Sequence, residues 1–166
     1  MNPTSWQERT ELLVKSENLE KLRNAHVFVA GLGGVGAFAA EMLCRAGIGS
    51  ITIADSDSVV ASNRNRQLLA LESTQGQRKV DIMAQRMLDI NPSLNLTIHD
   101  VFLRDEVTRQ VVNKRFDYVV DAIDTVSPKI FFIHHVLSSG LPLVSSMGAG
   151  GRLDPSKVLI ADRSEE

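Results

Sequence analysis

The feature that most constrains this chain is a glycine-rich hexapeptide, GLGGVG, at residues 31–36. The residues before it, HVFVA (26–30), are mostly apolar and β-branched, which is typical of a buried strand. The residues from 33 to 47, GGVGAFAAEMLCRAG, predict a helix that ends at Gly47. Glycine adopts the backbone conformations that a tight turn between a strand and a helix requires. We therefore expect a strand–turn–helix unit, the building block of a parallel sheet.

Stretches that predict strands and helices alternate along the rest of the sequence. Besides 26–30, strands are expected at 50–54, 94–98, 116–123, 141–147 and 157–162, and helices at 8–23, 33–47, 77–90, 104–114 and 127–140. In the last helix we expect Ser127 at the N-cap, Pro128 at the first helical position and Gly140 at the end. The alternation predicts an α/β fold, with a Rossmann-like, doubly wound, mainly parallel sheet and helices on both faces. Ligands of such sheets bind at the carboxyl ends of the strands.

Composition is that of a globular protein. The 166 residues are 43% hydrophobic and carry a formal net charge of -2, which argues against a general nucleic-acid coat. No apolar run approaches the roughly 20 residues of a membrane span, and the polar N-terminus is untypical of a signal peptide, so we expect a cytoplasmic location. We expect a helical segment over 1–24 and one compact domain over 25–166. The single cysteine, Cys44, is expected to be a buried core thiol.

The glycine loop predicts a nucleotide-binding site. Gly31, Gly33 and Gly36 have the G-x-G-x-x-G spacing, in which the backbone approaches a phosphate and the next helix points its N-terminal amides at the charge. Asp55 ends the following predicted strand, where a carboxylate can bind ribose hydroxyl groups. Both NAD and ATP contain an adenosine ribose, so Asp55 does not choose between them.

The loop after that strand, DSDSVVASNRNRQ (55–67), favours ATP. A triphosphate carries more charge than a diphosphate, and the expulsion of pyrophosphate needs cations aimed at the phosphates and usually Mg²⁺. Arg64 and Arg66 lie in this loop, and Lys79 begins the next predicted helix. Asn63 and Gln67 can donate hydrogen bonds to phosphate oxygens.

Asp124 is the expected magnesium ligand. It follows the predicted strand at 116–123, so it opens onto the same end of the sheet as the glycine loop. Asp121 and Asp57 are candidates for a supporting carboxylate behind it. The competing interpretation is a solvated loop that uses Asp, Ser and Asn for turns. That interpretation leaves unexplained why arginine, lysine and aspartate from three segments converge on one strand end.

The order of these motifs resembles the nucleotide-binding domain of the ubiquitin-activating-enzyme-like superfamily. The resemblance rests on GLGGVG, DSDSV, SNRNRQ, Lys79 and DAID, and it covers roughly residues 8–162. Within the superfamily, RAGIGSITIAD, INPSL, DAIDTVSPK and GAGGRLDP are similar to the branch of tRNA threonylcarbamoyladenosine dehydratases. Enzymes of that branch use ATP to activate the threonylcarbamoyl carboxylate of a modified adenosine in tRNA, and the product cyclises. The resemblance thus implies an ATP-dependent adenylating enzyme, a ligase that modifies tRNA, with an adenylation domain over 25–166.

The resemblance also implies a role for each matching residue. The implied nucleotide-binding residues are Gly31, Gly33, Gly34, Gly36, Asp55, Asp57, Asn63, Arg66, Gln67 and Lys79, and the implied catalytic residues are Arg66 and Asp124. Asp55 would bind the ribose and Asp124 would hold Mg²⁺. Family members are usually homodimers in which an N-terminal arginine reaches the partner's site, and Arg9 is the candidate here. The substrate carboxylate attacks the α-phosphorus, so catalysis needs positioning and charge stabilisation rather than a protein nucleophile.

Three other functions stay open at this point. A sulfur-carrier adenylyltransferase of the molybdopterin or thiamine type would activate the Gly-Gly C-terminus of a ubiquitin-like carrier protein. That branch tends to carry CxxC pairs, and this chain has a single cysteine. An NAD-dependent oxidoreductase would have no use for Arg66, Lys79 and Asp124. A non-catalytic remnant would dimerise and would have lost its affinity for ATP.

The chain ends at Glu166, and superfamily members continue further, so we expect a C-terminally truncated or naturally short form. ATP binding is expected of it, whereas the part that recognises tRNA is expected to be largely missing. The GAGG run at 148–151 is either a simple glycine turn or a wall of the substrate pocket. The histidines are expected to be structural: the adjacent His134 and His135 point to different sides of a helix, so no zinc site is expected.

Overall fold

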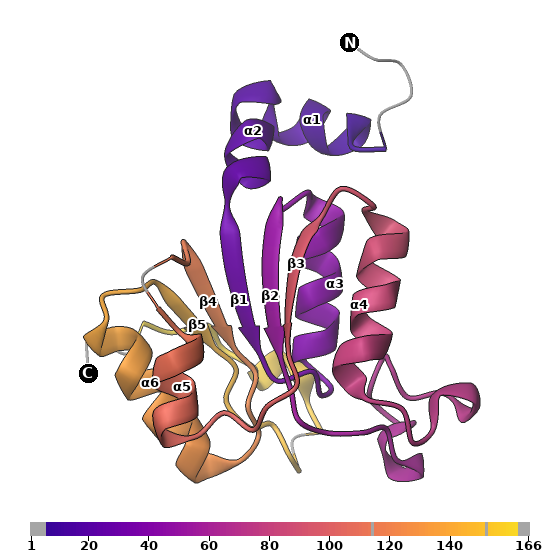
Figure 1. Ribbon diagram of the computed structural model, residues 1–166, viewed down its shortest axis with the longest axis vertical. Helices are drawn as coiled ribbons and strands as arrows, with labels where there is room; N and C mark the ends of the chain where they lie inside the picture. Colours follow the sequence, from indigo (N-terminus) through magenta and orange to yellow (C-terminus); the bar gives the residue numbers. More distant parts are fainter. Residues whose placement is uncertain (1–5, 114, 152, 163–166) are drawn as a thin grey trace.

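The fold is a five-stranded parallel sheet covered by helices on both faces (Figure 1). The computed structural model describes residues 6–113, 115–151 and 153–162. The strands are β1 His26–Ala30, β2 Ser50–Ala54, β3 Asn95–His99, β4 Tyr118–Asp121 and β5 Leu143–Ser145, in the order β3-β2-β1-β4-β5. The helices are α1 Glu8–Val14, α2 Ser16–Asn24, α3 Gly36–Ala46, α4 Lys79–Ile90, α5 Asp105–Val111 and α6 Val126–Ser138. The predicted Rossmann-like, doubly wound fold is confirmed.

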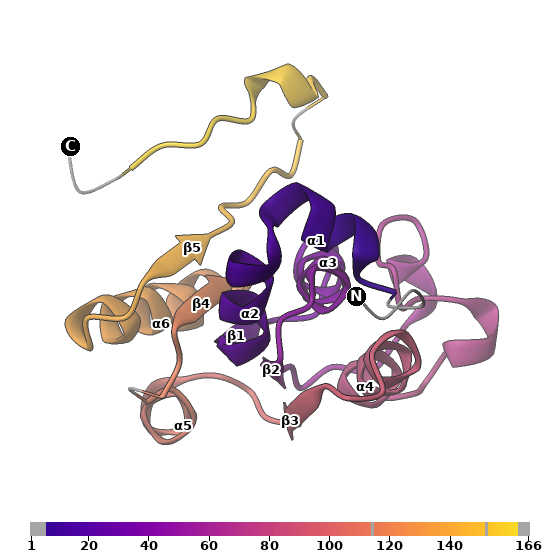
Figure 2. The same cartoon turned by 90° about the horizontal axis from the view of Figure 1, so that it is seen from above.

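The alternation of side chains along β1 divides the interior into two cores. Val27 and Val29 face the core beneath α3 and α4, while Phe28 and Ala30 face the core beneath α5 and α6. Seen from above, these two helix pairs lie on opposite sides of the sheet (Figure 2). The order of the sheet reverses at β1, whose neighbours are β2 and β4. Crevices at the carboxyl ends of strands on either side of such a reversal are the usual ligand sites of this architecture.

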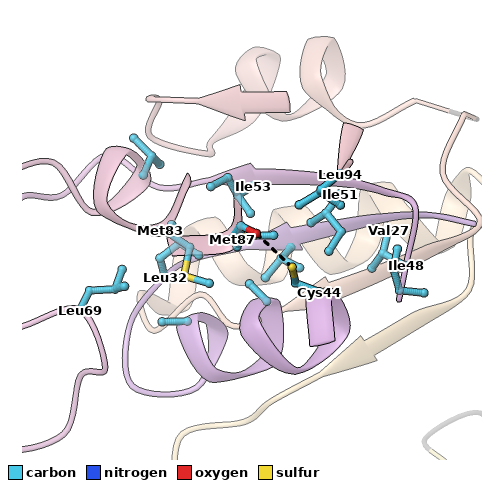
Figure 3. Packing of buried hydrophobic residues seen from close by; sticks show 14 of the residues in the cluster. Val27, Leu32, Cys44, Ile48, Ile51, Ile53, Leu69, Met83, Met87 and Leu94 are labelled. Atoms are coloured by element: carbon cyan, nitrogen blue, oxygen red, sulfur yellow. Dashed lines mark hydrogen bonds between the residues drawn. The ribbon is translucent and has the colours of Figure 1, made fainter. Parts of the chain in front are cut away.

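Cys44 lies in the first of these cores, as predicted. Its side chain is fully buried among apolar residues of α3, α4 and the sheet, and its Sγ contacts the carbonyl oxygen of Met87 at 3.4 Å (Figure 3). Burial raises the pKa of the thiol, which keeps it protonated. Cys44 is therefore a packing residue.

The N-terminal segment differs from the single helix predicted over 8–23. Lys15 has φ = 70°, which ends α1 and lets α2 start in a new direction. This break brings Gln7 back against α2, where its Oε1 accepts hydrogen bonds from Arg23 at 2.8 and 3.1 Å. Leu19 of α2 is 1% exposed and fixes the pair of helices on the amino ends of the strands. The division into a segment over 1–24 and a domain over 25–166 stays a prediction.

The predicted start of the last helix and one predicted strand are wrong. α6 begins at Val126 with Thr125 as its N-cap, so Ser127 lies inside the first turn and does not cap it, and Pro128 is the third helical residue rather than the first. The stretch predicted as a strand at 157–162 forms no strand. Its first residue is the last of a 3₁₀ turn, Pro155–Lys157. The apolar residues after this turn, Val158, Leu159 and Ile160, are exposed. Their apolar, β-branched character predicted a strand, but a strand also needs a neighbouring backbone to pair with.

Glu41 links α3 to α4 and makes stability depend on pH. This carboxylate is 5% exposed and accepts hydrogen bonds from Arg45, at 2.8 Å, and from Arg86. The hydrogen bond from Arg86 holds the pKa of Glu41 below its ordinary value, although burial opposes the shift. A carboxyl group whose pKa is depressed by folding stabilises the native state above about pH 4.5, and this contribution is lost as the pH falls further.

We expect Glu41→Gln to remove this acid sensitivity. At neutral pH the variant should lose about 1 kcal/mol, because the arginines keep a neutral acceptor in place of a charged one. Below pH 4.5 its thermal midpoint should fall less steeply than that of the unchanged chain, as measured by circular dichroism. Glu17→Gln, in an exposed pair with Lys21, is the control and should keep the original pH dependence. Parallel acid profiles for Glu41→Gln and the unchanged chain would contradict this assignment.

Candidate functional site

The glycine loop lies at the carboxyl end of β1, between that strand and α3 (Figure 1). Gly31 has φ = +86°, and a Cβ there would stand 2.8 Å from the carbonyl oxygen of Ala122. A Cβ on Gly36 would stand 1.8 Å from the carbonyl oxygen of Gly31. These two glycines let the loop fold on itself and against the turn after β4. The predicted tight turn is therefore present, with α3 starting at Gly36 rather than at Gly33.

The middle of the loop is more open. The nearest atom to a Cβ on Gly33 would be Nε2 of Gln67, at 3.9 Å. A Cβ on Gly34 would contact the backbone and side chain of Arg66 at 3.4 and 3.6 Å. The glycine loop and the segment 63–67 therefore meet, as expected of segments that follow two parallel strands. Loop backbone beside Gly33 can be approached closely by a ligand.

Asp55 ties the glycine loop to the end of β2. Its Oδ2 accepts the backbone N–H of Leu32 at 2.6 Å, and its Oδ1 accepts the backbone N–H of Asp57 at 2.7 Å. An ionised carboxylate can accept about four hydrogen bonds, so about two positions are left for a ligand such as a ribose. The same side chain can thus organise the loop and bind a nucleotide, and the ribose role stays a prediction.

Asn63 and Gln67 are both buried side chains beside this loop. Asn63 is 8% exposed, and its Oδ1 accepts the backbone N–H of Val60 at 3.2 Å, which leaves its NH₂ group as the donor for a ligand. Gln67 is 9% exposed, and its buried Oε1 has no hydrogen-bond partner among the described residues. A buried amide oxygen without a partner is unfavourable by about 1–3 kcal/mol, which is typical of a group that serves a ligand.

The two arginines of the loop have different surroundings. The backbone and aliphatic atoms of Arg66 lie beside Gly34, and its Nη1 donates to the carbonyl of Ser62 and the side chain of Asn65, at 3.2 and 2.9 Å. Within the described part of the chain it has no carboxylate partner. Arg64 instead pairs with Glu72, so its charge is already balanced by a carboxylate. Of the two cations expected to serve a phosphate, the geometry favours Arg66.

Lys79, at the first position of α4, already has a partner. It is 4% exposed, and its Nζ donates to Oδ2 of Asp57 at 2.8 Å, although 65% of the Asp57 side chain is exposed. The sequence did not indicate this pair, because the two residues are far apart along the chain. Lys79 can bind a phosphate only if Asp57 shares it or moves. If Lys79 binds a phosphate while it stays paired with Asp57, the Asp57 carboxylate lies beside the same ligand.

Asp124 and Asp121 follow β4 in very different environments. Asp124 is exposed, and among the described residues its carboxylate is bound only by the hydroxyl of Thr125, which donates to it at 3.4 Å. Asp121 is fully buried and binds Lys129 and Ser145, each at 2.6 Å. The Asp124 carboxylate can therefore bind a cation from solvent, whereas the Asp121 carboxylate is occupied by bonds within the protein. Lys129 and Ser145 are the functional candidates that sequence reasoning missed.

The remaining candidates lie elsewhere. The ring Nε2 of His26 contacts the hydroxyl of Thr52 at 2.8 Å, and that of His135 contacts the carbonyl of Val112 at 3.2 Å, so both are structural. Among the described residues there is no cluster of three metal-binding side chains. Arg9 is in α1, at the opposite end of the sheet from the glycine loop, so it cannot reach the site of its own chain (Figure 1). None of the helices in the described ranges has the length and apolar character of a membrane-crossing segment.

Known proteins that are similar to this chain identify its family. The profile of the ThiF family matches residues 7–162. The chain belongs to the ThiF family. A tRNA threonylcarbamoyladenosine dehydratase of Bacillus subtilis is 46% identical over 157 residues, which cover 95% of this chain. A molybdopterin-synthase adenylyltransferase of Salmonella typhimurium is a more distant relative, 33% identical over 150 residues. The resemblance predicted from the motifs is confirmed, and the dehydratase branch is favoured over the sulfur-carrier branch.

A solved structure of this family matches the fold closely. The Escherichia coli tRNA N6-threonylcarbamoyladenosine dehydratase in complex with ATP has a TM-score of 0.91 and 39% identity, and the match covers 98% of this chain and 68% of that one. This chain spans 62% of the length of the Bacillus subtilis dehydratase. The Escherichia coli relative was solved with ATP bound.

Proposed function

We propose that this chain binds ATP and carries the adenylation step of a tRNA threonylcarbamoyladenosine dehydratase. The observation that carries the proposal is the meeting of the glycine loop with Arg66, which has no carboxylate partner among the described residues, and with the donor Nε2 of Gln67 beside Gly33. A dinucleotide needs little beyond backbone amides for its diphosphate. A triphosphate makes use of Arg66, Lys79 and a metal ligand at the same strand ends.

The proposed chemistry is attack of the threonylcarbamoyl carboxylate on the α-phosphorus of ATP. A bond forms between the carboxylate oxygen and phosphorus, the bond to the bridging oxygen breaks, and pyrophosphate leaves with the electron pair. The nucleophile is already an anion, so no protein base has to remove a proton. The protein orients the two reactants and offsets negative charge on the phosphates through Arg66 and Lys79. Cyclisation of the activated group then releases AMP.

The donor set fits magnesium. Mg²⁺ prefers oxygen ligands and is usually held by one or two carboxylates together with phosphates and water. Asp124 supplies an exposed carboxylate, and Asp57 supplies another beside Lys79. When bound, Mg²⁺ would lower the charge repulsion between the triphosphate and an incoming carboxylate. We propose Asp124 as its ligand.

The proposal extends to partners and location. We propose that two copies form a homodimer in which Arg9 of one chain approaches the site of the other, because α1 is too far from its own. The tRNA substrate favours the cytoplasm. A sulfur-carrier adenylyltransferase is the second candidate, supported by the Salmonella typhimurium relative. Such an enzyme would use the same nucleotide site on a carrier protein's C-terminal carboxylate.

Calorimetric titration of the purified chain with ATP and Mg²⁺, and separately with NAD⁺, tests the proposal. ATP should bind and NAD⁺ should not. Asp124→Ala should weaken the binding of ATP in Mg²⁺ about tenfold, a loss of roughly 1.4 kcal/mol. Asp89→Ala, which removes an exposed carboxylate from α4, is the control and should bind as the unchanged chain does. Binding of NAD⁺ that is indifferent to Asp124→Ala would refute the adenylating function and leave a dinucleotide domain.

A further inference from the structure

A buried group of polar side chains lies directly beneath the β4–α6 turn. Asp121 ends β4 and is 0% exposed, and Lys129 of α6 is 8% exposed. The Nζ of Lys129 donates to Oδ2 of Asp121 at 2.6 Å, and the hydroxyl of Ser145 in β5 donates to the same oxygen, also at 2.6 Å. Side chains from three elements, β4, α6 and β5, therefore meet at the carboxylate of Asp121. Taking two charges out of water costs free energy, so a pair of this kind is weak evidence for stability as such.

The ion pair also holds the backbone of the residue that precedes Asp124. Oδ1 of Asp121 accepts the backbone N–H of Ile123 at 3.0 Å. The Nζ of Lys129 donates to the carbonyl oxygen of Ile123, also at 3.0 Å. Both polar groups of Ile123 are thus bound by the two charged side chains. Apolar residues in the same places could fill the volume, but they could not form these two bonds.

The turn held in this way rests against the glycine loop. The backbone N–H of Ala122 donates to the carbonyl of Ala30 at 2.8 Å, which continues the ladder between β4 and β1. The carbonyl oxygen of Ala122 lies 2.8 Å from the position of a Cβ on Gly31. The Ile123 peptide is therefore the link between a fixed point at the glycine loop and the carboxylate of Asp124.

We propose that Lys129 is a positioning residue for Asp124. Together with Asp121 and Ser145 it fixes the Ile123 backbone, so that the Asp124 carboxylate is presented to a cation bound with the nucleotide at the glycine loop. This inference rests on the proposed function, because it concerns the same nucleotide site. It assigns to α6 and β5 a part in the site that acts through the Ile123 backbone.

The test is the response of ATP affinity to Mg²⁺, measured by calorimetry on the whole chain. The double variant Asp121→Asn with Lys129→Met removes both charges together, so that neither is left buried alone. Its affinity for ATP without metal should stay within about twofold of the unchanged chain. The gain in affinity on addition of Mg²⁺ should fall about tenfold, to that of Asp124→Ala, and adding Asp124→Ala should cause no further loss. The single variant Lys129→Arg, which keeps a cation beside Asp121, should keep most of the response of ATP affinity to Mg²⁺.

Glu41→Gln is the matched control, because it alters a buried, arginine-bound carboxylate in α3 that does not contact the turn. It should keep the full response to Mg²⁺. A folded double variant that also keeps the full response would overturn the inference. If the double variant does not fold, Ser145→Ala decides, since it removes one hydrogen bond to Asp121. It should reduce the response about twofold to threefold, and an unchanged response would overturn the inference.

The pattern of results separates this inference from the proposed function. If the unchanged chain does not bind ATP, or binds it without any effect of Mg²⁺, the proposed site and the inference both fail. If Asp124→Ala abolishes the response to Mg²⁺ while the Lys129 variants behave as the unchanged chain does, the proposed function stands and only the positioning role fails.

Discussion

Gly36→Ala is expected to prevent the chain from folding stably. The added methyl group would stand 1.8 Å from the carbonyl oxygen of Gly31 and 3.0 Å from Cβ of Ala122. The first of these contacts is with backbone, so it can be relieved only by moving the glycine loop or α3. Replacing glycine by alanine inside a helix is ordinarily favourable by roughly 0.5–1 kcal/mol, so the expected effect has the opposite sign from helix propensity.

We expect Gly36→Ala to cost more than about 4 kcal/mol, a large part of the 5–15 kcal/mol by which ordinary domains are stable. Urea unfolding followed by circular dichroism measures this loss. Gly33→Ala is the matched control in the same loop, because its nearest neighbour would be the Gln67 amide at 3.9 Å. It should stay within about 1 kcal/mol of the unchanged chain and instead weaken ATP binding, since its methyl group would occupy the approach to the loop backbone. Equal stability of the two alanine variants would refute this account of the loop.

Local patterns in the sequence were sufficient for the fold. The glycine spacing and the apolar runs predicted β1, β2 and the tight turn between β1 and α3, because these features depend on neighbours along the chain. Gly47 is the C-cap of α3 with φ = +98°, as its place after the helix predicted. The predictions failed where a distant partner decides the outcome. Lys15 adopts a positive φ, and the apolar stretch after Lys157 forms no strand.

The meeting of the candidate residues was predictable from the sequence but their pairing was not, and their roles stay predictions. The glycine loop, Asp55, Arg66 and Asp124 come to one edge of the sheet because they follow parallel strands. That Lys79 is bound to Asp57, and Arg64 to Glu72, depends on how the loop folds over itself. The Asp121–Lys129 pair had a signal that could have been used. A carboxylate at the end of a strand that is predicted to be buried needs a cation or donors nearby, and Lys129 is the first lysine after it.

Arg66→Ala should have the largest effect on the proposed reaction. The aliphatic part of the Arg66 side chain lies beside Gly34, and no carboxylate of the described residues pairs with its guanidinium, so its charge is available to the phosphates. Loss of one preorganised donor aimed at developing charge costs about 3–4 kcal/mol, which corresponds to about a hundredfold to a thousandfold in rate. The rate is measured as pyrophosphate release with the nucleoside threonylcarbamoyladenosine as the acceptor, which does not depend on contacts with the rest of a tRNA. Calorimetry with ATP should show a smaller loss, about tenfold, because charge shifts onto the leaving pyrophosphate only during reaction.

Arg64→Ala separates this role from a general effect of charge. It removes the same charge from the same loop, but Arg64 is turned towards Glu72. An exposed ion pair contributes about 0–1 kcal/mol, so stability and ATP affinity should both stay within a few-fold of the unchanged chain. If the two variants lose ATP affinity equally, the loop acts only through its net charge, and the contact of Arg66 with Gly34 has no part in binding. A loss of ATP affinity in Arg66→Ala alone would instead indicate that the phosphates bind where the segment 63–67 meets the glycine loop.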